Sequence, residues 1–67
     1  MQPYILRWYD DKAYRVHDRT TDEEVGYVLG RFQGWAARTI MGREVVERQF
    51  LRDAAGALYE EWIAGKR

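Results

Sequence analysis

GWAARTIMGREVVERQFLRDAAGALY, residues 34–59, is the stretch that decides the fold of this 67-residue chain. Its first half predicts two strands, Trp35 to Met41 and Glu44 to Phe50, which are joined by a tight turn at Gly42-Arg43. After Phe50 the apolar residues recur at helical spacing, and this change of period predicts a helix that packs on the sheet. The apolar stripe of this helix consists of Leu51, Ala55, Leu58 and Trp62.

The N-terminal residues predict a β-hairpin. Tyr4 to Tyr9 alternates between two faces, the turn-forming run Asp10-Asp11-Lys12 follows, and Ala13 to His17 alternates again. Trp8 falls on an apolar stripe of the first strand, as Trp62 does on the stripe of the helix. We therefore expect both tryptophans in the core.

The segment from Thr20 to Met41 admits two interpretations. Thr21-Asp22-Glu23-Glu24 matches a helix capping box and is followed by apolar residues at helical spacing, which favours a helix. Against the helix stand Gly26, Gly30 and Gly34, because each glycine costs about 1 kcal/mol relative to alanine in a helix interior. The alternative is a pair of strands.

The strand interpretation is the one we favour. It places a loop at Asp18 to Glu24 and a turn at Phe32-Gln33-Gly34. Between them, Val25, Tyr27 and Leu29 share one face of a strand. The glycines then mark places where a bulky neighbour crosses the sheet or where the strand bends.

These elements together predict an α+β fold in a single small domain, residues 1–67. The sheet is an antiparallel β-meander of four to five short strands packed against one C-terminal helix; the alternative is a β-hairpin followed by two helices. A chain this short buries only about 60% of the surface that its unfolded form exposes, so its core is small. A partner or a second copy of the chain would add stability.

Charge is balanced in total and uneven along the chain. Lys plus Arg and Asp plus Glu number 11 each. Asp10 to Glu24 holds six acids against three bases, whereas Arg31 to Arg52 holds five arginines against two acids. The chain contains no cysteine, which suits a reducing cytoplasm, and no apolar run approaches the roughly 18 residues of a membrane-spanning helix. We expect a cytoplasmic protein with no membrane partner.

Composition excludes most catalytic and metal chemistry. The chain contains no Ser and no Cys, so its single histidine, His17, has neither of these nucleophiles to activate. One histidine without cysteines cannot build a zinc site, and the acidic residues lack the spacing of a calcium loop. We therefore expect that the protein is not an enzyme and that it holds no cofactor and no metal.

Within residues 34–59 the pattern of Trp, Ala-Arg, Gly-Arg, Phe and Ala-Ala resembles two families of DNA-binding domain. They are the three-stranded-sheet-plus-helix domains of plant ethylene-response factors and the arm-binding N-terminal domains of phage tyrosine integrases. The matching residues are Trp35, Ala37, Arg38, Gly42, Arg43, Phe50, Ala54, Ala55, Ala57 and Tyr59. The resemblance implies a sheet face that enters the DNA major groove and contacts it through Arg31, Trp35, Arg38, Arg43 and Arg48.

Two functions follow as hypotheses. The first is a small DNA-binding or regulatory module that contacts double-stranded DNA with the arginine and tryptophan residues of its sheet. The second is a protein-interaction module in which the exposed aromatic residues Tyr9, Phe32 and Trp35 bind a host protein or a second copy in a homodimer. The layout also resembles short uncharacterised proteins of actinobacteria and their phages, and a phage-encoded effector or an accessory subunit fits the second hypothesis. A basic sheet face would favour DNA, and an apolar patch rimmed by charge would favour protein.

Overall fold

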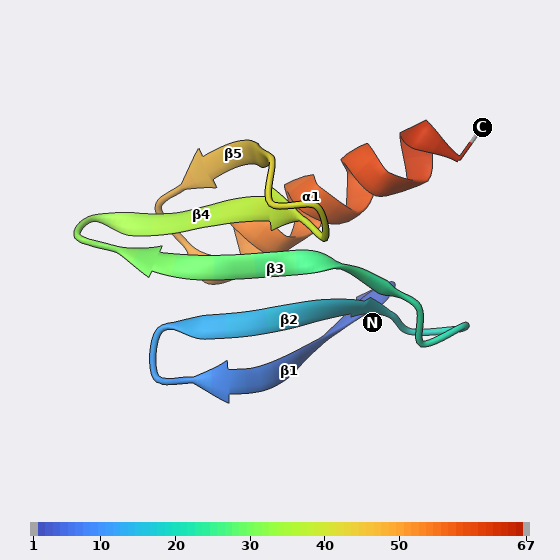
Figure 1. The fold of residues 1–67 in the computed structure, drawn as a ribbon, viewed down its shortest axis with the longest axis horizontal. Coiled ribbons are helices and arrows are strands. Elements are labelled where there is room, and N and C mark those ends of the chain that lie inside the picture. The colour runs from blue at the N-terminus through green and yellow to red at the C-terminus, as the bar shows by residue number, and fades with distance from the viewer. Residues whose placement is uncertain (1, 67) are drawn as a thin grey trace.

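The computed structural model of the chain describes residues 2–66 as a five-stranded antiparallel sheet packed against one helix (Figure 1). The strands lie in chain order, so each pairs with its neighbours in sequence. The elements are β1 (Tyr4–Asp10), β2 (Ala13–Asp18), β3 (Glu24–Arg31), β4 (Gly34–Thr39), β5 (Glu44–Arg48) and α1 (Leu51–Gly65). The α+β meander with a C-terminal helix is confirmed, and the alternative with two helices is wrong, because residues 24–39 form two strands.

The last two strands are shorter than the sequence predicts. β4 ends at Thr39 because its N–H donates to Arg43 O at 2.9 Å and its carbonyl accepts from Gly42 N–H at 2.9 Å, which turns the chain. Gly42 has a φ of 90°, a left-handed conformation that glycine adopts without a Cβ clash. β5 ends at Arg48, and Phe50 is already the N-cap residue of α1.

The two faces of the sheet have different surroundings. α1 lies behind the sheet in Figure 1 and packs mainly on β3, β4 and β5, leaving β1 largely uncovered. Residues paired across two strands lie on the same face of the sheet. The face that carries the buried residues Val16, Val28 and Ala37, together with their cross-strand partners, is the one that α1 covers, and we call it the helix side. We call the other side of the sheet, which no helix covers, the open face.

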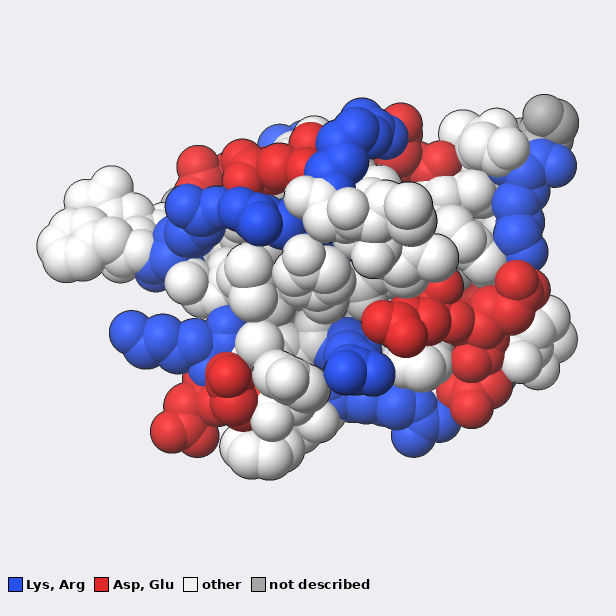
Figure 2. All heavy atoms as spheres, in the orientation of Figure 1, with Lys and Arg blue, Asp and Glu red and all other residues white. Residues whose placement is uncertain are grey.

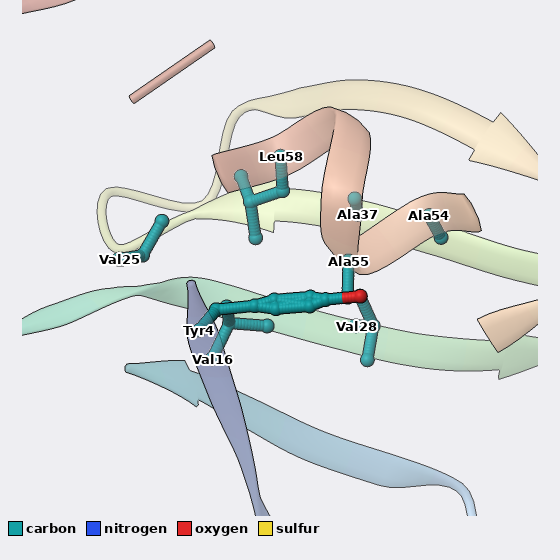
Figure 3. Packing of buried hydrophobic residues seen from close by; sticks show 8 residues of the cluster. All are labelled: Tyr4, Val16, Val25, Val28, Ala37, Ala54, Ala55 and Leu58. Atoms are coloured by element: carbon teal, nitrogen blue, oxygen red, sulfur yellow. The ribbon is translucent and has the colours of Figure 1, made fainter. Parts of the chain in front are cut away.

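The core lies between α1 and the sheet and is built mostly from small side chains (Figure 3). Leu58 is the largest fully buried side chain, and Tyr4 reaches across the sheet so that its hydroxyl donates to Arg52 O at 3.2 Å. A Cβ added at Gly26 would overlap the Arg38 carbonyl oxygen and lie 3.0 Å from Leu58 Cδ2. The helix can therefore approach the sheet closely only where these residues are small. The cluster of buried residues consists of Tyr4, Val16, Val25, Val28, Ala37, Ala54, Ala55 and Leu58.

Two expectations about side-chain position are wrong, and one is confirmed in part. Val25 does not share a face with Tyr27 and Leu29; it is buried in the core, because the β2–β3 register shifts next to Val16. Trp8 is 66% exposed, because α1 does not reach the end of β1 that carries it. Trp62 is half-buried and packs against the core, as expected.

Asp18 connects the β2–β3 loop to the helix. Its Oδ2 accepts from the N–H groups of Thr20 at 3.0 Å and Thr21 at 2.8 Å, and its Oδ1 accepts from the Tyr59 hydroxyl at 2.7 Å. Asp18 is 6% exposed, and it is the buried acidic residue of the described chain. The loop N–H of Thr21, with the Tyr59 hydroxyl, holds the pKa of this carboxyl below its usual range despite its burial.

The lowered pKa of Asp18 predicts a contribution to stability that depends on pH. A carboxyl with a lower pKa in the folded state stabilises the fold above its unfolded value, about pH 4, and this contribution is lost as pH falls through the folded-state pKa. Urea unfolding of wild type and Asp18→Asn should therefore converge as pH is lowered below 4, with wild type more stable at pH 6. Tyr59→Phe removes one hydrogen-bond donor to Asp18, so its free energy of unfolding at pH 6 should lie between those of wild type and Asp18→Asn. The same dependence of stability on pH in all three proteins would contradict this role of Asp18.

The contact at Gly26 predicts a steric effect on stability. Gly26→Ala should lower the free energy of unfolding by about 2 kcal/mol or more, because the added Cβ must displace the β4 backbone or Leu58. Gly65→Ala is the matched control, since an added Cβ there meets nothing within 4 Å, and its effect should stay within about 0.5 kcal/mol. Equal effects of the two substitutions, measured by chemical denaturation, would show that the approach of α1 is not limited by Gly26.

Candidate interaction surface

The five residues expected to contact DNA lie on three separate parts of the molecule. Arg31 and Arg38 are on the open face, where their strands present them to solvent. Trp35 and Arg48 form a cross-strand pair on the helix side. Arg43 lies in the β4–β5 turn beside α1, with its Nη2 3.9 Å from Glu61 Oε1. The structure therefore brings together Arg31 and Arg38, and separately Trp35 and Arg48.

Arg31 and Arg38 share one carboxylate on the open face. Glu44 Oε1 lies 3.0 Å from Arg31 Nη2 and 3.8 Å from Arg38 Nη2. Arg38 is held against the sheet, and its buried Nε has no hydrogen-bond partner among the described residues. Each exposed ion pair is weak, yet together they cancel much of the positive potential that an anionic ligand would meet.

The other arginines of the open face are also next to acidic side chains. Arg7 Nη2 lies 2.7 Å from Asp22 Oδ1, and Arg15 Nη1 lies 3.9 Å from Glu24 Oε1. Arg15 in addition lies over the Tyr9 ring, with its Cζ 5.0 Å from the ring centroid. The open face thus carries charges of both signs in pairs rather than a basic field.

Between these charges the open face carries a groove of about 450 Å³. Its apolar walls come from Tyr9, Tyr27, Leu29 and Ile40, and Ala13 lies buried at its base. Its charged lining residues are Asp10, Arg15 and Glu24. Figure 2 shows this side of the molecule as an uncharged band across the middle of the sheet, with red and blue side chains above and below it.

Part of this groove was visible in the sequence. The alternation in β3 predicts that Tyr27 and Leu29 share a face, and Tyr9 was expected to be exposed. Ala13 and Ile40 were missed as lining residues, because their position depends on which strands lie side by side. Ala13 could have been placed from the register of β2 on β3, which aligns it with Leu29.

The three aromatic residues expected in a protein-binding patch do not form one surface. Tyr9 is on the open face, whereas Trp35 is on the helix side, half-buried, with its ring 5.9 Å from that of Tyr14. Phe32 is 98% exposed at the β3–β4 turn. Phe32 and Phe50 both line a wide cleft of about 1040 Å³ between this turn and the start of α1.

No group of three or more His, Cys, Asp or Glu side chains lies close enough together in residues 2–66 to hold a metal ion. The single helix of this part of the chain is neither long enough nor apolar enough to cross a membrane. The open-face groove combines apolar walls with a rim that carries both signs of charge.

Because Glu44 offsets the charges of Arg31 and Arg38, its removal should strengthen binding to a polyanion. Glu44→Gln leaves Arg31 and Arg38 without their shared carboxylate, so the variant should elute from a heparin column at higher salt than wild type. Glu47→Gln makes the same change in net charge on the same strand and is the matched control. Equal retention of the two variants would mean that net charge, and not the Glu44 ion pairs, governs binding.

Comparisons with known proteins gave no relative from which a function could be transferred. No family model matches the chain, and neither a curated protein nor a solved structure matches it. The resemblance of residues 34–59 to sheet-plus-helix DNA-binding domains therefore stays a prediction.

Proposed function

We propose that this chain is a small, non-catalytic protein-interaction module that binds a partner protein through its open face. The observation that carries the proposal is the groove walled by Tyr27 and Leu29, whose charged rim contains both signs. Exposed apolar surface rimmed by polar groups is typical of protein-binding sites, and tyrosine supplies much of the binding energy in such interfaces.

The charges near the groove favour a protein partner over a nucleic acid. Arg15 is the one basic residue that lines it, against the carboxylates of Asp10 and Glu24, so a phosphate entering there would meet net negative charge. A protein segment can instead place an apolar side chain between Tyr27 and Leu29. Its polar groups can then pair with both members of the Arg15–Glu24 pair.

This proposal fits two kinds of cytoplasmic partner. One is a host protein, if the chain is a phage-encoded effector, and the other is a larger assembly in which the chain serves as an accessory subunit. Both would use the same groove, because each presents a folded surface with an apolar anchor and mixed charge.

Double-stranded DNA is the second candidate ligand. It is favoured by Arg31 and Arg38, which lie on the same exposed face and could contact phosphate oxygens if Glu44 were displaced. Such binding would rest on few contacts, so it would weaken strongly as salt is raised.

Tyr27→Asp tests the protein-interaction proposal. The new carboxylate would lie between Arg15 and Arg38, its cross-strand neighbours, so the fold should be retained while one apolar wall of the groove is lost. A partner captured by immobilised wild type should bind this variant at least about tenfold more weakly, as measured by titration with the purified partner. Circular dichroism checks that the variant is folded.

Phe32→Asp is the matched control, because it places the same charge at the most exposed aromatic residue, outside the groove. Its affinity for the partner should equal that of wild type. If Phe32→Asp abolishes binding and Tyr27→Asp does not, the cleft beside the β3–β4 turn is the site and the proposal is wrong. A salt-sensitive complex with a random-sequence DNA duplex that is lost in Arg38→Glu would favour the DNA candidate instead.

A further inference from the structure

The two edges of the sheet differ in how well they are protected against pairing with another strand. β5, at one edge, has five residues, and three of them, Glu44, Glu47 and Arg48, are charged. β1, at the other edge, has seven residues with one charged side chain between Tyr4 and Tyr9. Charged and short edge strands discourage pairing, whereas a longer apolar edge offers a row of unpaired backbone groups. β1 is therefore the open edge of this sheet.

β1 also carries apolar side chains that the fold leaves uncovered. Leu6 and Trp8 point to the helix side, as shown by their pairing with Val16 and Tyr14, but α1 does not extend over them. Leu6 is partly buried against the core, and Trp8 is 66% exposed. An adjacent strand would cover both without any change in the rest of the chain.

We propose that β1 pairs antiparallel with β1 of a second copy of this chain, about a two-fold axis at Leu6, to form a symmetric dimer with one continuous sheet. An antiparallel pair keeps both helix sides on the same side of the sheet only if the axis passes through a residue. With the axis at Leu6, the two Leu6 side chains are opposite each other. Each Trp8 then lies opposite Tyr4 of the second copy, and each Ile5 opposite its Arg7.

The side chains favour this register over those with the axis at Arg7 or at Trp8. An axis at Arg7 would place two guanidinium groups directly opposite each other, and like charges in that position are destabilising. An axis at Trp8 would place Leu6 opposite Asp10, and it would involve the irregular end of β1, where the pairing with β2 shifts. At Leu6 all helix-side pairs are apolar, and Arg7 keeps its bond to Asp22, 2.7 Å away, while its methylene groups cover Ile5 of the second copy.

The dimer would add a property to the proposed interaction module. Two copies joined at β1 would place their open faces side by side on one sheet, so a repeated or two-fold symmetric partner could be bound at two sites at once. The dimer itself depends on β1 alone. It can therefore fail or succeed independently of the open-face groove.

Charge swaps at Leu6 test the proposal. Wild type should form a concentration-dependent dimer in sedimentation equilibrium, while Leu6→Glu and Leu6→Lys should each be monomeric over the same hundredfold concentration range. An equimolar mixture of the two variants should regain the dimer, because opposite charges then meet at the two-fold axis. Regain in the mixture also proves that neither variant had simply misfolded.

Three outcomes would overturn the proposal. A monomeric wild type throughout the range excludes the dimer. Dimers of unchanged stability in Leu6→Glu place the contact elsewhere than β1. If Tyr27→Asp loses the dimer and Leu6→Glu keeps it, self-association takes place through the open face instead.

Discussion

The close approach of α1 to β3 and β4 is the contact on which the rest of this structure depends. The helix lies close to the sheet because the residues between them are small. Ala37, Ala54 and Ala55 are fully buried, and Leu58 and the Arg38 carbonyl leave no room for a Cβ at Gly26. Small residues lose little side-chain entropy on burial, but they also contribute little apolar area, so the core gains modest stability from each. Asp18 supplements it by joining the β2–β3 loop to Tyr59 of the helix through a short hydrogen bond of 2.7 Å.

A single 15-residue helix cannot cover a five-stranded sheet, and this limit creates both candidate interaction surfaces. The helix packs on β3, β4 and β5 from one side, so within residues 2–66 no helix covers the opposite face of the sheet, and α1 makes few contacts with β1. Apolar residues on the helix side are exposed where α1 does not reach them, as Trp8 on β1 is. The groove on one face and the edge strand are thus two consequences of one geometric fact.

The charge distribution shows how folding can cancel a pattern that is plain in the sequence. The acidic stretch from Asp10 to Glu24 and the basic stretch from Arg31 to Arg52 suggest two oppositely charged regions. In the folded chain, antiparallel neighbours mix them with the charges of other segments: Arg7 meets Asp22 and Lys66 meets Glu23 across distant parts of the chain. Within the basic stretch itself, Glu44 forms an ion pair with Arg31 and so offsets part of the positive charge. A surface of paired charges results.

The sequence by itself determined the N-terminal hairpin, the turn at Gly42-Arg43 and the C-terminal helix, because strand alternation, turn residues and the helical stripe are signals read over a few neighbouring residues. It favoured two strands over a helix for residues 20–41 without deciding between them. It also indicated that Tyr27 and Leu29 share a face. Only the tertiary structure decided which face the helix covers, that a register shift turns Val25 into the core, and that Glu44 compensates two arginines. Those features depend on the register between neighbouring strands and on the packing of the helix against the sheet. Neither is encoded in a pattern of a few consecutive residues.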